Sequence, residues 1–147
     1  MMSKTLLYRL FGLGKTPSKY ASTLRQEGIV LVDEGIGGTV TYKQFVAPGR
    51  RHSWKKSRFS GSLVLTRQTF AAFAMTRPLV YIPLADERLP ALRCSVEESV
   101  VLLVTYDASL LDKGWSGIVE CRFRTAKAQS FLEGLVQGPA SGGPDDE

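Results

Sequence analysis

Hydrophobic residues recur at every second position over most of the chain between residues 29 and 124, which is the spacing of β-strands. In the segment GIVECRFR, apolar and charged residues alternate from Val119 to Arg124, so we expect this strand to have one buried face and one face in water. The same criteria predict a short strand at 29–34, a glycine turn at 35–38 and then seven strands, near 39–47, 59–67, 69–75, 79–84, 91–96, 99–106 and 116–124.

Helical spacing replaces this alternation at the two ends of the chain. Residues 3–12 have a short amphipathic pattern, and residues 16–28 have a second one with Thr16 as its expected N-cap. Thr125 is placed to cap a last helix, whose apolar stripe comprises Ala128, Phe131, Leu132, Leu135 and Val136. We therefore expect two short N-terminal helices and one C-terminal helix.

The length of 147 residues fits one domain with a single core. Residues 29–137 form the predicted β-rich body, and residues 1–28 form a helical extension before it. Residues 138–147, with the sequence GPASGGPDDE, are too rich in glycine, proline and acid to offset the entropy of ordering. We expect them to be a disordered acidic tail.

The formal net charge of +5 is concentrated in the middle of the sequence. All the charged residues between Glu34 and Asp86 are lysines and arginines. Such a block favours an anionic partner, which can be a lipid headgroup, a nucleic acid or an acidic protein.

No apolar run approaches the length of a membrane-spanning helix, and the N-terminus lacks the features of a signal peptide. We therefore expect a cytoplasmic protein, with peripheral attachment to a membrane left open. Cys94 and Cys121 each lie in a strand-like apolar pattern, so we expect both to be buried, reduced thiols.

Three segments resemble parts of the pleckstrin-homology-like superfamily, especially its GRAM-like and bacterial members. TVTYKQF and FSGSLVLTRQTFAAFA are similar to the first three strands of that fold, and GIVECRFRTAKAQSFLEGL is similar to its last strand and helix. The resemblance covers roughly residues 39–137. It implies a mainly β fold with helices, in which a seven-stranded antiparallel split barrel is capped by a C-terminal helix.

The resemblance also implies where a ligand would bind. Superfamily members that bind phosphoinositides have a lysine late in the first strand and a basic-x-arginine motif in the second, which Lys43 and the Lys56/Arg58 pair match here. The family fold brings the loops at 47–58, 75–78 and 107–116 to one open end of the barrel. A tryptophan common in the last helix of eukaryotic members is missing, and Phe131 is expected to fill its space.

The candidate site is centred on the segment APGRRHSWKKSRFSG at 47–61, where five cations surround a histidine and a tryptophan. Amphipathic indoles favour the membrane interface, and lysines and arginines are attracted to anionic lipid. The predicted contacts to an anionic ligand are Lys43, Arg50, Arg51, Lys55, Lys56, Arg58, Arg77 and Lys113, and the predicted interfacial anchors are Trp54 and Trp115.

Other interpretations of this segment stay open. Its charges can simply keep a long hairpin solvated, and Trp115 can belong to the core. A protein partner can bind a sheet edge or the N-terminal helices, which would also allow self-association. Basic residues among aromatics also suit nucleic acid, although no recognised nucleic-acid motif is present and this partner is disfavoured.

Nothing in the sequence predicts an enzyme, a metal site or a cofactor. His52 is the chain's one histidine, and the adjacent acidic residues at 33–34, 86–87 and 97–98 fall at predicted strand ends. The GLGKT motif at 12–16 lacks the first glycine of a phosphate-binding loop, because that position is Arg9. The predicted function is therefore a non-enzymatic module for anionic lipid or membrane surfaces, with protein interaction or self-association as the alternative.

Overall fold

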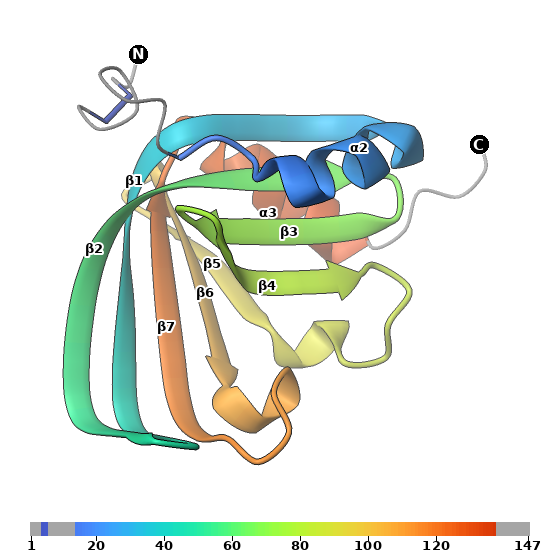
Figure 1. The fold of residues 1–147 in the computed structure, drawn as a ribbon. Helices are drawn as coiled ribbons and strands as arrows, with labels where there is room; N and C mark the ends of the chain where they lie inside the picture. The colour runs from blue at the N-terminus through green and yellow to red at the C-terminus, as the bar shows by residue number, and fades with distance from the viewer. Residues whose placement is uncertain (1–3, 6–13, 138–147) are drawn as a thin grey trace.

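A computed structural model describes residues 4–5 and 14–137 and shows one curled antiparallel sheet with a C-terminal helix inside the curl (Figure 1). The strand order is β4-β3-β2-β1-β7-β6-β5, so β4 and β5 are the two edges. The strands are β1 (Ile29–Ala47), β2 (Arg50–Thr66), β3 (Thr69–Ala74), β4 (Arg77–Pro83), β5 (Arg93–Glu97), β6 (Val101–Asp107) and β7 (Ser116–Arg124). The helices are α2 (Ser18–Glu27) and α3 (Ala128–Gln137), with short 3-10 turns at Leu89–Ala91 and Ala108–Leu110. The predicted mainly β fold of seven antiparallel strands with a C-terminal helix is confirmed, and its sheet is curled into a half-barrel.

The predicted glycine turn at 35–38 is wrong, because β1 continues through it. The register of β1 against β2 shifts between Glu34 and Ile36, and Gly35 has a φ of 69°. The strand bends at this irregularity, so its two parts run in different directions (Figure 1). The glycines therefore bend one long strand that the sequence suggested was two strands joined by a turn.

The predicted loop at 47–58 is also wrong, because β2 begins at Arg50. β1 and β2 pair from Ala47 and Arg50 onward, which leaves only Pro48 and Gly49 as the connection. Gly49 has a φ of 74°, a conformation that suits glycine in a tight hairpin turn. The basic segment is thus half of a β-hairpin.

The main core fills the concave side of the sheet. Alternate residues of every strand and one side of α3 contribute to it, and its largest fully buried side chains include Phe45, Phe70, Phe123 and Phe131. Phe131 of α3 is 0% exposed, as the sequence predicted for the helix that plugs the fold. The last residue of the predicted apolar stripe, Val136, is 77% exposed, so the core does not cover the whole stripe.

A second, smaller core lies on the opposite side of the sheet beneath α2. Leu24 of α2 packs with Val64, Ala71 and Phe73, and Tyr20 contacts the same cluster. β2 and β3 are therefore covered on both faces where they pair, which explains their runs of consecutive buried residues.

The predicted N-caps of the second and last helices, Thr16 and Thr125, can be compared with the structure. Thr16 does not cap α2, because Pro17 is the N-cap and the Thr16 backbone N–H donates to the Glu34 carboxylate at 2.7 Å. Thr125 does accept a hydrogen bond from the Lys127 backbone N–H at 3.1 Å, and it also donates to Asp33 at 2.6 Å.

Two predicted segments lie wholly or mostly outside the described residues. Of the predicted helix at 3–12, only Lys4 and Thr5 are described, and they are not helical. The predicted tail at 138–147 is outside as well. None of the described helices is long and apolar enough to cross a membrane.

Candidate anion-binding face

The hairpin places its cations on a surface that β7 extends. Three rows of side chains cross β2, β1 and β7 in that order: Trp54, Lys43 and Ile118; Lys56, Thr41 and Glu120; and Arg58, Thr39 and Arg122. Their neighbours along the strands, such as Val40 and Cys121, point into the main core. We call the surface of these three rows the outer face.

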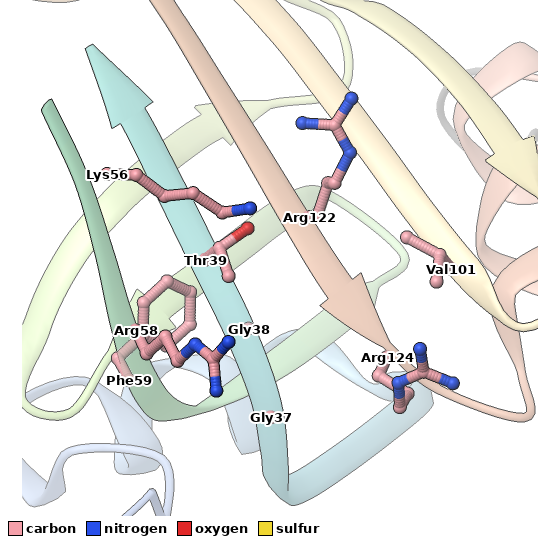
Figure 2. Close-up of a pocket in the computed structure, with 9 residues that line it drawn as sticks. All are labelled: Gly37, Gly38, Thr39, Lys56, Arg58, Phe59, Val101, Arg122 and Arg124. Carbon is pink, nitrogen blue, oxygen red and sulfur yellow. The ribbon is translucent and has the colours of Figure 1, made fainter. Parts of the chain in front are cut away.

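A hollow of about 410 Å³ lies on the outer face at the third row (Figure 2). We call it the outer groove. Figure 2 shows Thr39 on β1 between the cations of β2 and those of β7. None of the residues that line it is acidic: they are Gly37, Gly38, Thr39, Lys56, Arg58, Phe59, Val101, Arg122 and Arg124.

Two adjacent glycines explain why the groove is hollow. Gly37 lies on the same side of β1 as Thr39 and contributes no side chain, so the floor stays open beside it. A Cβ on Gly38 would instead point the other way, 2.5 Å from the Phe59 ring and 2.8 Å from the Arg122 carbonyl oxygen. Packing against Phe59 therefore requires glycine at position 38.

Carboxylates neutralise part of the charge on the outer face. Arg122 donates to Glu97 at 3.0 Å and to Glu120 at 3.4 Å, and Lys43 donates to Glu120 at 2.9 Å. The hydrogen bond from Lys43 is the main cause that lowers the pKa of Glu120, and the one to Glu97 is the main cause that raises the pKa of Arg122. Lys43, a predicted ligand contact, is thus held in an internal ion pair.

The other cations of the groove are free of such pairs. Within residues 4–5 and 14–137, Lys56, Arg58 and Arg124 form no ion pair, and all three side chains are exposed. They line the groove on both sides of β1, Lys56 and Arg58 from β2 and Arg124 from β7 (Figure 2). Their positive charge is therefore available to an anion.

The Thr39 hydroxyl is an unusual feature of the groove floor. Its oxygen is buried and has no hydrogen-bond partner among the described residues. Buried polar groups are normally paired, because an unpaired one costs about 1–3 kcal/mol. The hydroxyl is an unused donor and acceptor between two strands that bear cations.

The turn end of the hairpin displays a solvent-exposed indole. Trp54 is 62% exposed, and no other aromatic side chain in the described part of the chain is exposed. Arg51 and Lys55 near it are exposed as well. Ile118, in the same row as Trp54, is 37% exposed, so two apolar side chains lie beside the cations.

The structure places other predicted contacts on the opposite side of the sheet. The Arg50 guanidinium lies 5.4 Å from the centre of the Tyr42 ring, and Arg77 donates to the Tyr42 hydroxyl at 3.4 Å. Arg77 also lines a cavity of about 170 Å³ together with Asp112 and Trp115. The segments 75–78 and 107–116 do meet there, but Lys56 and Arg58 are on the other face.

The two tryptophans differ in their surroundings. Trp115 is half-buried and meets the edge of Phe45, with ring centres 5.5 Å apart and an interplanar angle of 86°. It packs against the main core, unlike Trp54. Lys113 is exposed in the loop before β7 and lines neither the groove nor the cavity.

Seven of the nine residues that line the groove were not predicted as site residues, among them Arg122, Arg124, Gly37 and Thr39. Arg122 and Arg124 were predicted only to lie on the solvent-facing side of the last strand. No sequence pattern marked Gly37 or Thr39 as a site residue. The alternation in GIVECRFR showed that both arginines face solvent. What was missing was the pairing of β7 with β1, which brings them beside the hairpin.

The remaining titratable candidates do not form a reactive centre. His52 stacks on Phe45 at 6.1 Å, and its pKa is lowered by partial burial and then by the charges of Lys55 and Arg50. Burial raises the pKa of Cys94 to about 11 and that of Cys121 to about 12, so both thiols are protonated near neutral pH. Among residues 4–5 and 14–137, no three histidine, cysteine, aspartate or glutamate side chains are placed to hold a metal ion.

Comparison of the chain with protein-family models, with curated proteins and with solved structures finds no match in any of the three. The resemblance to the pleckstrin-homology-like superfamily therefore stays a prediction from the sequence and the order of elements.

Proposed function

We propose that this protein is a non-enzymatic binding module that attaches to anionic membrane surfaces through the outer face of its β1–β2 hairpin. The observation that supports this best is the position of Trp54, which is 62% exposed and shares one face of β2 with Lys56 and Arg58. An indole near the turn can enter the headgroup region while the cations behind it contact lipid phosphates.

The charges on the hairpin are sufficient for reversible attachment. Each lysine or arginine near an anionic membrane contributes about 1 kcal/mol, and exposed charges act only within a screening length of about 8 Å at physiological salt. Lys56 and Arg58 on the outer face and Lys55, which leaves the edge strand β2 on its other side, together then account for about a hundredfold in affinity. Binding of this kind is expected to weaken strongly as salt is added.

Vesicle co-sedimentation tests the proposal. The full chain should bind phosphatidylcholine vesicles that contain phosphatidylserine, and binding should rise with the phosphatidylserine content. A Lys55→Ala/Lys56→Ala/Arg58→Ala variant should bind about a hundredfold more weakly.

A variant with the same net charge provides the control. Lys19, Arg25 and Arg67 are exposed and lie on or beside α2, away from the hairpin. Their replacement by alanine should leave most of the binding intact. Equal losses in the two triple variants, or no binding of the unmodified chain at low salt, would refute a hairpin-specific membrane site.

A second candidate function uses the backbone of the same hairpin. Residues 50–59 of β2 pair with β1, but no described strand pairs with their other edge, because β3 joins β2 only from Gly61. Such an edge can accept a strand from a partner, and its lysines and arginines favour an acidic one. A complex that survives high salt and the triple alanine change would support this function over membrane binding.

We also propose that the fold is a pleckstrin-homology-like split barrel of the GRAM-like or bacterial type. Three features support the proposal: seven antiparallel strands, an unpaired junction between β4 and β5, and a C-terminal helix that fills the curl. An experimental structure whose connections differ from this strand order would remove the basis for the assignment.

A further inference from the structure

The outer groove differs from a diffuse patch of charge because it has a shaped floor. Thr39 lies directly between Arg58 on β2 and Arg122 on β7 in the cross-strand register. Gly37 leaves space beside it, and the hollow of about 410 Å³ can hold a small polar group. The groove therefore combines free cations, an unpaired hydroxyl and a defined volume.

The number of charges favours a group with more than one negative charge. Three cations of the groove have no carboxylate partner in the described part of the chain: Lys56, Arg58 and Arg124. Arg122, in contrast, already forms ion pairs with Glu97 and Glu120. A phosphate monoester has a charge of about −1.5 to −2 at neutral pH and three acceptor oxygens. A diester has a charge of about −1 and two free oxygens, and it would leave more of these donors unused.

The Thr39 hydroxyl supplies a further donor at the floor. Figure 2 shows this hydroxyl on the side of Lys56 and the methyl group toward Arg58. A rotation to another χ1 rotamer can move the hydroxyl to the position of the methyl group, and displacement of the flexible Lys56 side chain also uncovers the hydroxyl. Either movement lets the hydroxyl hydrogen-bond to an oxygen in the groove and removes the cost of the unpaired group.

We propose that the outer groove binds one phosphate monoester, with Lys56, Arg58 and Arg124 around its oxygens and Thr39 donating from the floor. The site deepens the proposed membrane function, because it shares Lys56 and Arg58 with the hairpin surface. The same chemistry is offered by a lipid with a terminal phosphate and by a free phosphorylated metabolite. A nucleic acid offers mainly phosphodiesters and fits the groove less well.

Nuclear magnetic resonance titration of the full chain tests the site directly. Inorganic phosphate and glycerol 3-phosphate should shift the backbone amide signals of Gly37, Gly38 and Thr39 with saturation. Dimethyl phosphate at equal ionic strength should bind at least tenfold more weakly, because it lacks the second charge and the third oxygen. No saturable shift at these amides, or equal binding of dimethyl phosphate, would overturn the proposal.

The Thr39→Val variant separates a binding role from a structural one. It removes an unpaired buried hydroxyl but keeps the shape, so the melting temperature should be unchanged or higher. Glycerol 3-phosphate should nevertheless bind about tenfold more weakly. Ser62→Ala is the matched control, because Ser62 has a second buried hydroxyl without a partner among the described residues and does not line the groove. A Thr39→Val protein that binds glycerol 3-phosphate as the unmodified chain does would refute the role of Thr39.

Vesicles distinguish the two sources and keep this inference separate from the membrane proposal. If the monoester is a lipid, phosphatidic acid vesicles should bind more tightly than phosphatidylserine vesicles of equal surface charge, and Thr39→Val should reduce the difference. If the monoester is a free metabolite, glycerol 3-phosphate should saturate the groove with no such difference between vesicles. Saturable glycerol 3-phosphate binding without any vesicle binding would refute only the membrane function, whereas vesicle binding without any groove response would refute only the monoester site.

Discussion

Trp54 and Ile118 lie in one cross-strand row of the outer face, on either side of Lys43. Neighbouring strands are about 4.8 Å apart, so the two side chains leave the sheet within about 10 Å of each other. Both are exposed, and the next two rows contain Lys56 and Arg58. The outer face thus has an apolar end near the hairpin turn and a cationic region behind it, an arrangement suited to the boundary between acyl chains and headgroups.

The two tryptophans should respond in opposite ways to replacement by alanine. Trp54→Ala should weaken binding to phosphatidylserine vesicles about tenfold and leave stability nearly unchanged, because the indole is exposed. Trp115→Ala should cost about 2–3 kcal/mol of unfolding free energy, because the half-buried ring packs edge-on against Phe45. Urea unfolding and vesicle co-sedimentation of both variants measure the contrast. If both variants were folded and Trp115→Ala lowered vesicle binding more than Trp54→Ala did, the assignment of Trp54 as the membrane anchor would be wrong.

Removal of the Glu120 charge should strengthen membrane binding. Glu120 neutralises Lys43 and shares Arg122 with Glu97, so Glu120→Gln adds one net positive charge to the outer face. One charge near an anionic surface is worth about 1 kcal/mol, which is about fivefold in affinity. Co-sedimentation at several salt concentrations should show a gain that shrinks as salt rises. An unchanged or lower affinity would show that the outer face does not contact the membrane.

Glu120 should also make the free energy of unfolding depend on pH. The Lys43 hydrogen bond lowers the pKa of Glu120 in the folded state, so its contribution is present above the ordinary glutamate pKa of about 4.3 and is lost as pH falls through the folded value. Urea unfolding should therefore show Glu120→Gln to be less stable than the unmodified chain at neutral pH, with the difference shrinking at pH values below about 4.3. Glu133→Gln on α3, where Glu133 is exposed and forms no ion pair in the described residues, is the control. A difference independent of pH would contradict the assigned role of the ion pair.

The sequence predicted those parts of the fold in which hydrophobic periodicity is strong. The last strand has the predicted bounds, Ser116–Arg124, and Phe131 in the helix after it is fully buried. The segment RRHSWKKS has no such alternation, because none of its side chains is buried, although the partner strand β1 buries Tyr42, Phe45 and Ala47. Its strand conformation comes from pairing with residues 40–47, which local sequence does not reveal.

The candidate site was predicted only in part for a related reason. A loop would let all of its cations gather at one end, whereas a strand alternates them between two faces. Lys55, which pairs with Tyr42, therefore leaves β2 on the side opposite to Lys56 and Arg58. The alternation is interrupted at Gln44, whose φ is 50°, and beyond this point Arg50 lies over Tyr42. Arg122 and Arg124 join the latter through β7, a contact between distant parts of the sequence that periodicity within one strand cannot indicate.

Adjacent glycines at the bend of β1 should differ sharply in their tolerance of a methyl group. Gly38→Ala should cost about 2–3 kcal/mol of unfolding free energy, because its Cβ would lie 2.5 Å from the Phe59 ring and 2.8 Å from the Arg122 carbonyl oxygen. Gly37→Ala should stay within about 1 kcal/mol of the unmodified chain, because among the described residues its Cβ would meet only a methyl carbon of Thr5, at 3.8 Å. That methyl group would also fill the groove beside Thr39, so glycerol 3-phosphate should bind Gly37→Ala more weakly although the fold is intact. Urea unfolding together with the same titration measures both effects, and equal stability of the two variants would show that Phe59 does not pack against the bend as described.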